Sequence, residues 1–136
     1  MFKLEINNLT KSRINKIFLK KIADRTFKTL KSKKLKELSL VIVGENKIKE
    51  LNKKYRKKNK VTDVLAFDYG KQGEIFICLH QAKKQAKKIG HSLNKELAIL
   101  LIHGILHLMG YEDQTKKGYN KMAEAQNKIL SQIHKF

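Results

Sequence analysis

The apolar run from Leu97 to Met109, which carries His103 and His107, constrains this chain more than any other feature. It is the longest apolar stretch in a lysine-rich sequence, yet it is shorter than the roughly twenty residues that a membrane span requires. After Glu96, apolar residues lie on nearly every side of the expected helix, which is typical of a helix at the centre of a core. Histidines four residues apart lie on one face of a helix, one turn apart, so both imidazoles can reach one metal ion.

A third ligand follows the two histidines. Gly110 can end the helix because glycine accepts the left-handed conformation of a sharp turn, and Asp113 can then fold back toward the imidazoles. Three protein ligands with one open position are what a catalytic metal site needs. Two alternatives stay open: the histidines can be core residues bonded to nearby backbone, and Asp113 can be an exposed turn residue.

The spacing H-x-x-x-H-x-x-G-x-x-D also matches the ligands of the metzincin proteases. Those enzymes carry a glutamate directly after the first histidine, where it acts as the general base. Gly104 occupies that position in this chain. The sequence therefore has the metal ligands of a peptidase but lacks its base, which argues against peptide hydrolysis.

Length and composition predict a single globular domain over residues 1–136, because 41% of the residues are hydrophobic and occur in periodic clusters. The single cysteine, Cys78, excludes an internal disulfide and fits a small buried position. The N-terminus lacks the basic-then-apolar layout of a signal peptide, so we expect a cytoplasmic protein.

The formal net charge of +19 favours a polyanionic partner, with nucleic acid or the ribosome ahead of an anionic membrane. Part of this charge has a simpler origin. Lysine far outnumbers arginine, which occurs only at Arg13, Arg25 and Arg56, and proline is absent. Such a skew indicates compositional drift toward lysine, so the charge supports nucleic-acid binding without establishing it.

Hydrophobic periodicity predicts strands at residues 2–6, 38–43, 61–67 and 74–79. Helices are expected from a cap at Asn8 or Thr10 to about Phe27, around residues 48–55, at 80–89, from a cap at Ser92 to Met109, and at about 117–134. Interleaved elements of this kind predict an α/β (α+β) fold, a small mixed four-stranded sheet packed against helices.

Individual side chains carry further expectations. Ile17 and Ile89 are expected on the apolar faces of their helices. His80, His91 and His134 lie outside the metal motif and are expected at the surface.

Three segments together resemble a known family. Residues 103–111, His-Gly-x-Leu-His-Leu-x-Gly-Tyr, are similar to the H-G-x-L-H-L-x-G-Y-D-H signature of the YbeY family of bacterial endoribonucleases. Residues 51–56 and 62–67 are similar to that family's L-N-x-x-Y-R and T-D-V-L-S-F segments. The similarity stays in register from about residue 37 to residue 113, so it is far more specific than the histidine pair alone.

The resemblance implies a zincin-like fold and a metal-dependent endoribonuclease that is specific for single-stranded RNA. It also implies ribosomal RNA and the small ribosomal subunit as partners, with no membrane partner. The roles that follow are 3′-end processing of small-subunit ribosomal RNA, within ribosomal RNA maturation, and ribosome quality control.

The resemblance further implies zinc held by three histidines. His103 and His107 match two of them, whereas Asp113 stands at the third position and Glu112 stands before it, where the family usually has aspartate. A carboxylate oxygen binds zinc at about the same distance as an imidazole nitrogen, but it shifts the preference toward harder ions. We expect one Zn²⁺ per chain, with Mn²⁺ or Mg²⁺ as alternatives.

Arg56 is expected to act as a catalytic residue together with the two histidines. A guanidinium can hold two oxygens of a phosphodiester in a geometry that lysine cannot supply. Lys57, Lys58 and Lys60 form a basic loop after it, which is expected to contact the RNA backbone. The alternative for this loop is an ordinary solvated run of charges. No general base can be named from the sequence.

Two rival functions remain at this point. The first is a zincin-type metallopeptidase or another metal hydrolase, and the missing glutamate counts against it. The second is a non-catalytic ribosome assembly factor whose metal is structural, and nothing in the sequence excludes it.

Overall fold

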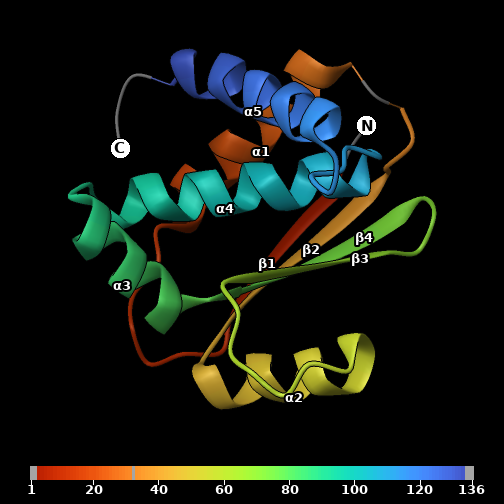
Figure 1. Cartoon of the computed structure of the whole chain (residues 1–136). Coiled ribbons are helices and arrows are strands. Elements are labelled where there is room, and N and C mark those ends of the chain that lie inside the picture. Colours follow the sequence, from red (N-terminus) through yellow and green to blue (C-terminus); the bar gives the residue numbers. More distant parts are fainter. Residues whose placement is uncertain (1–2, 32, 134–136) are drawn as a thin grey trace.

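The computed structural model describes residues 3–31 and 33–133, which form one sheet with helices on both faces (Figure 1). The elements in chain order are β1 (Lys3–Asn8), α1 (Lys16–Leu30), β2 (Glu37–Val43), α2 (Glu45–Arg56), β3 (Val64–Asp68), β4 (Gln72–Cys78), α3 (Leu79–Ile89), α4 (Leu93–Leu108) and α5 (Lys116–Ser131). The predicted α/β (α+β) fold with a mixed four-stranded sheet is confirmed. In the part of the chain described here, no helix combines the length and the apolar character needed to cross a membrane.

The strands run in the order β1-β2-β4-β3 across the sheet. Strand β2 is parallel to both of its neighbours, β1 and β4, whereas β3 runs antiparallel to β4 at one edge of the sheet. The central strand β2 is apolar nearly throughout and buried on both faces, as a parallel strand covered on both sides should be. The hairpin between β3 and β4 turns at Gly70, whose φ of 87° lies in the left-handed region that glycine tolerates.

Two hydrophobic cores lie on opposite faces of this sheet. Helix α4 crosses one face and is flanked by α1, α3 and α5, whereas α2 covers the other face (Figure 1). The smaller core, beneath α2, contains Val41, Val43, Ile48, Leu51, Leu65, Phe76 and Cys78. Cys78 is fully buried, as predicted, and this burial raises the pKa of its thiol. Edge strand β3 contributes alternate side chains to both cores, because successive residues of a strand point to opposite faces.

Helix α4 is the central element of the larger core. Ser92 caps its first turn by accepting a hydrogen bond from the Lys95 amide at 3.1 Å, as predicted. Gly104 lets the helix approach the sheet closely, because a Cβ at this position would lie 2.9 Å from the Cδ1 of Ile75 on β4. The helix ends at Leu108, whose carbonyl oxygen accepts a hydrogen bond from the Lys34 ammonium at 3.1 Å.

The start of α1 was predicted wrongly. Asn15 caps this helix by accepting from the Phe18 amide at 3.0 Å, rather than Asn8 or Thr10. Asn8 instead orders the preceding loop, since its side chain donates to the Ser12 carbonyl and accepts from Thr10. Asparagine is a good helix cap at either position, Asn8 or Asn15, so local chemistry alone did not distinguish a capped helix from an ordered loop.

Two isoleucines expected on buried helix faces are exposed instead. Ile17 is 73% exposed on α1, where Leu19, Ile22 and Ala23 fill the buried face. Ile89, at the end of α3, is 67% exposed. Strand β3 also starts later than predicted, at Val64 rather than residue 61. Periodicity places residues on a helix face, but it does not tell which part of that face meets the core.

The histidines outside the metal motif behave differently from one another. His80 is exposed, as expected, and lies 3.3 Å from a Glu45 carboxylate oxygen. His91 was expected at the surface but is largely buried, with Nε2 at 2.6 Å from Oε1 of the buried Glu96. Gln85 donates to the other oxygen of Glu96 at 2.7 Å. A buried carboxylate requires such partners, so it draws His91 inward. His134 and residue 2 of the predicted first strand lie outside the described residues.

The close approach at Gly104 can be tested by adding a single methyl group. Alanine favours a helix over glycine by about 1 kcal/mol, but overpacking a core costs roughly 1–3 kcal/mol. We expect Gly104→Ala to lower the free energy of unfolding by about 1 kcal/mol in a urea titration. In an Ile75→Val background, which lacks the contacting Cδ1, the same change should cost less. Equal losses in both backgrounds would contradict the contact.

Candidate metal centre

The end of α4 and the loop after it bring together the three residues that the sequence predicted as ligands. The Nε2 atoms of His103 and His107 are 3.0 Å apart. Oδ2 of Asp113 lies 3.9 Å from each of them. Within residues 3–31 and 33–133, this is the one cluster of at least three histidine, cysteine or acidic side chains that could hold a metal ion. All three side chains are partly exposed, so a ligand from solvent can reach them.

These separations fit a common metal ion. Ligands in a tetrahedron with bonds of about 2.0–2.1 Å lie about 3.3–3.4 Å from one another. The observed distances of 3.0 Å and 3.9 Å bracket that value. Two imidazole nitrogens at 3.0 Å can share either one hydrogen or one cation, and the carboxylate beside them adds negative charge on the same side. The donor set therefore suits a divalent metal, with a fourth position open to solvent.

The surroundings of His103 favour its neutral form. Burial lowers the pKa of this imidazole below its ordinary value, and the neighbouring charge of His107 lowers it further. The carboxylates of Asp113 and Asp63 act in the opposite direction. On balance the pKa is lowered, so the surroundings favour the neutral imidazole. A neutral imidazole is the form that binds metal.

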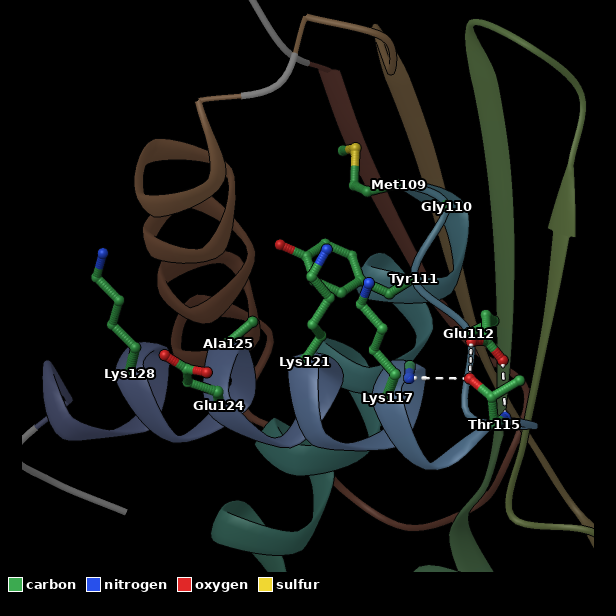
Figure 2. A pocket seen from close by; sticks show the side chains of 11 residues that line it. Met109, Gly110, Tyr111, Glu112, Thr115, Lys117, Lys121, Glu124, Ala125 and Lys128 are labelled. Atoms are coloured by element: carbon green, nitrogen blue, oxygen red, sulfur yellow. Dashed lines mark hydrogen bonds between the residues drawn. The ribbon is translucent and has the colours of Figure 1, made fainter.

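The loop that carries Asp113 is held by Glu112. Gly110, with a φ of 95°, turns the chain away from α4. The carboxylate of Glu112 then accepts hydrogen bonds from the hydroxyl of Thr115 at 2.7 Å and from the Thr115 amide (Figure 2). It also accepts one from the amide of Gln114 at 2.8 Å. These donors, the Thr115 hydroxyl first, lower the pKa of Glu112, so the carboxylate is charged at neutral pH.

Thr115 extends this arrangement into α5. Its hydroxyl accepts from the Gly118 amide at 3.0 Å and caps the helix (Figure 2). A Cβ at Gly118 would overlap the Glu112 carboxylate, so glycine is required there. Sequence reasoning identified Glu112 only as a departure from the family signature and did not find its bonding role. The available signal was the spacing of Glu112, which stands three residues before Thr115, the residue that caps α5.

The histidines face a cleft of about 330 Å³ between α4 and β3. It is lined by Arg56, Asp63, Val64, Leu65, Ala66, Asp68, His103, Gly104, His107 and Leu108. Two of these, Asp63 and Asp68, were not predicted as site residues. Oδ1 of Asp63 accepts from the Val64 amide at 2.8 Å. The Asp68 carboxylate lies 2.7 Å from the Lys34 ammonium, and this hydrogen bond lowers its pKa.

Arg56 lies at this cleft although it comes from the opposite face of the sheet. Its Nη2 donates to the carbonyl oxygen of Ala66 at 2.9 Å, and its Cζ lies 5.7 Å from the centre of the Phe67 ring. The guanidinium therefore lies over the outer edge of β3 and lines the same hollow as the two histidines. The structure thus brings together the three residues predicted as catalytic.

The basic loop after Arg56 stays outside the cleft. Lys57, Lys58 and Lys60 are exposed and do not line the hollow. The loop is ordered by the buried Asn52, whose side chain donates to the Lys60 carbonyl at 2.9 Å and whose own carbonyl accepts from the Lys58 amide. RNA contact by these lysines stays a prediction.

A larger hollow, of about 590 Å³, lies between residues 109–112 and α5 (Figure 2). Lysines 117, 121 and 128 line it together with Glu124 and the ring of Tyr111. Tyr111 is partly buried and packs against the main core. This hollow contains none of the three ligands, so its greater size does not make it the metal centre.

Comparisons with known proteins agree with the motifs. The family model described as Endoribonuclease YbeY matches residues 3–134. A protein of Phytoplasma australiense named Endoribonuclease YbeY is 38% identical, and the match covers 97% of this chain and 96% of that protein. One of the same name from Aquifex aeolicus is 44% identical, over 73% of this chain and 71% of the relative. The solution structure of TM1509 from Thermotoga maritima matches with a TM-score of 0.63 and 27% identity, covering 95% of this chain and 90% of the other.

The bonding role of Glu112 predicts a local effect on the loop. Glu112→Ala should speed hydrogen exchange of the Gln114 and Thr115 amides, because both lose their acceptor. Mass spectrometry or NMR would measure this exchange. Glu124→Ala, which removes another acid from the same hollow, serves as the control and should leave these amides unchanged. Unaltered protection in Glu112→Ala would show that other contacts hold the loop.

Proposed function

The chain belongs to the endoribonuclease YbeY family, and we propose that it cleaves single-stranded RNA with a metal ion held by His103, His107 and Asp113. Family membership supports the endoribonuclease activity. The observation that carries the metal-dependent part is the convergence of three donor atoms within 3.9 Å of one another in a cleft that also contains Arg56. Catalytic roles for Arg56, His103 and His107 belong to this proposal.

We propose zinc as the metal, one ion per chain. Two imidazoles and one carboxylate form a donor set that zinc accepts in catalytic sites, and the distances suit a tetrahedron. The carboxylate of Asp113 makes the site harder and more negative than three histidines would. Mn²⁺ and Mg²⁺ therefore remain the alternatives, and metal selectivity is the property in which this chain should differ from relatives with a third histidine.

The residues of the cleft supply binding and charge stabilisation. A bound divalent metal supplies Lewis acidity toward a phosphoryl oxygen and lowers the pKa of water. Arg56 holds the non-bridging oxygens of the phosphodiester, because its guanidinium is positioned in advance by the Ala66 carbonyl and the Phe67 ring. Asp113 balances the positive charge of this arrangement.

We further propose that ribosomal RNA in the small ribosomal subunit is the substrate. The expected roles are 3′-end processing of small-subunit ribosomal RNA and ribosome quality control, in the cytoplasm. The resemblance of residues 37–113 to the family supports this assignment, and the net charge of +19 supports a polyanionic partner. Lys57, Lys58 and Lys60, exposed beside Arg56, are proposed to contact the RNA backbone.

The packing of Gly104 argues against the peptidase alternative. A metzincin-type peptidase needs a glutamate at this position, but the Cβ of any side chain there would meet Ile75, which is completely buried. The space for such a base is therefore filled by the core. A non-catalytic assembly factor remains an outcome of the experiments below.

Metal content tests the ligand set. Protein purified without chelator should carry about one metal ion per chain by elemental mass spectrometry, and His107→Ala and Asp113→Ala should lose most of it. Asp113→His should retain metal, because imidazole can replace the carboxylate as a third ligand. Asp68→Asn, which changes a cleft carboxylate outside the three-residue cluster, is the matched control and should keep wild-type content. Equal content in wild type and Asp113→Ala would remove Asp113 from the site.

Cleavage of a labelled single-stranded RNA tests the reaction itself. Wild type should cleave it, a chelator should suppress cleavage, and added metal should restore it, whereas His107→Ala prepared identically should be inactive. Arg56→Lys should lower kcat roughly 10²-fold or more, because lysine keeps the charge but not the two-pronged geometry. Arg25→Lys, on the exposed face of α1, is the control and should be fully active.

The rival functions give different results in this experiment. Cleavage of casein but not RNA by the metal-loaded protein would favour the hydrolase alternative. Absence of RNA cleavage at every metal tested, with co-sedimentation on small ribosomal subunits, would favour the assembly factor.

A further inference from the structure

Aromatic side chains gather at the outer edge of β3, on the face of the sheet that carries α2. The rings of Tyr55 and Phe67 meet edge to face with centroids 5.3 Å apart, and Phe67 in turn contacts the buried Phe76 at 5.9 Å. Tyr69 follows Phe67 by two residues and lines a hollow with Glu74, the residue that pairs with Phe67 in the sheet. The cluster therefore has a buried base and an exposed top.

The upper rings of this cluster are exposed to solvent. Tyr55 is 55% exposed and Tyr69 is 62% exposed, although only 7% of the residues are aromatic. Drift toward lysine explains the basic surface, but it does not explain tyrosines that leave most of their ring area in water. A ring held by Phe67 and open to solvent is a preformed surface for stacking.

Arg56 connects this aromatic surface to the metal centre. Its guanidinium contacts the ring of Phe67 while its Nη2 donates to the Ala66 carbonyl, and it lines the cleft with the two histidines. The Tyr55 ring and the Arg56 guanidinium both contact the Phe67 ring, at 5.3 Å and 5.7 Å from its centre, so both lie around one side chain at the edge of β3. A nucleotide whose phosphate contacts Arg56 can thus place a neighbouring base on Tyr55.

The charges around the ring suit a nucleic-acid strand. The Lys54 ammonium lies 5.2 Å from the centre of the Tyr55 ring, and the Arg56 Cζ lies 5.7 Å from the centre of the neighbouring Phe67 ring. Three acids, Glu5, Glu37 and Glu74, line a hollow with Tyr69 instead. The cations at Tyr55 and Phe67 therefore favour a phosphate on that side of the cluster, away from Tyr69.

We propose that Tyr55, supported by Phe67, stacks an unpaired base adjacent to the phosphate that Arg56 holds, and that this contact selects single-stranded RNA. The inference rests on the proposed function and adds a specificity residue to it. Bases in a duplex are stacked on both sides and paired, so they cannot lie on an external ring without being unstacked first. Stacking on a tyrosine is tolerant of base identity, so little sequence preference should result.

The experiment measures RNA binding without cleavage. All proteins carry His107→Ala, so that the substrate stays intact, and each binds a fluorescent single-stranded oligoribonucleotide in an anisotropy titration. Tyr55→Leu should raise Kd roughly 5- to 30-fold, the loss expected for one stacked base. Tyr55→Phe keeps the ring and should stay within about twofold. Tyr119→Leu, which removes another exposed tyrosine on α5, should also leave Kd unchanged.

Abasic oligonucleotides identify the base that stacks. Removing one base at a single position should weaken binding to the Tyr55 protein but not to Tyr55→Leu, because the contact is already absent there. Losses of equal size in both proteins would overturn the proposal, as would a Kd for Tyr55→Leu equal to that of the parent. A duplex of the same sequence should bind more weakly and be indifferent to Tyr55→Leu.

Two checks keep these outcomes distinct. Thermal unfolding verifies that each variant is folded, and Tyr55→Gln replaces Tyr55→Leu if the latter is not. Because binding is read separately from cleavage, a wild-type protein that cuts no RNA would contradict the proposed function. The abasic comparison would still decide whether Tyr55 stacks a base.

Discussion

The contact between α4 and the sheet is the constraint on which the site depends. Gly104 allows α4 to lie against Ile75. The leucines and isoleucines of α4 are buried on nearly every side of the helix. A helix enclosed in this way cannot rotate about its axis without opening cavities in a close-packed core. The orientation of His103 and His107 toward β3 is therefore fixed by packing, before any metal binds. The glycine that rules out a peptidase base is the same residue that sets this position.

The third proposed ligand is held by different forces. Asp113 lies in an exposed loop whose conformation depends on the turn at Gly110 and on the hydrogen bonds of Glu112 to Thr115 and Gln114. Polar bonds at the surface are weaker constraints than core packing, because water competes for each of them. The site thus combines two rigid ligands with one on a less stable segment, so changes at the third position can retune the metal preference without disturbing the fold.

Local patterns in the sequence predicted the sheet, the central helix and the grouping of His103, His107 and Asp113. These features follow from periodicities of two and 3.6 and from a turn at Gly110, all of which are encoded within a few residues. The errors at Asn15, Ile17 and His91 have another origin. At Ile17 the packing of other elements decides which part of the helix face is buried. At Asn15 and His91 local hydrogen bonds decide: Asn8 orders its own loop, and the buried Glu96, five residues after His91, bonds its imidazole. The family resemblance predicted a role for Arg56 together with the histidines. The periodicity of its own helix, which lies on the other face of the sheet, did not.

The edge of β3 explains why an arginine on the far side of the sheet takes part in the site. An edge strand exposes unpaired backbone groups, and natural proteins cover such groups to prevent association with other chains. Arg56 covers the Ala66 carbonyl, and this same hydrogen bond holds its guanidinium over the cleft. Because β3 is an edge strand, a side chain from α2 can pass around its outer edge to the metal face without crossing the sheet. Protection of the edge and placement of a cation for phosphate are therefore accomplished by one contact, and lysine could accomplish the first without the geometry of the second.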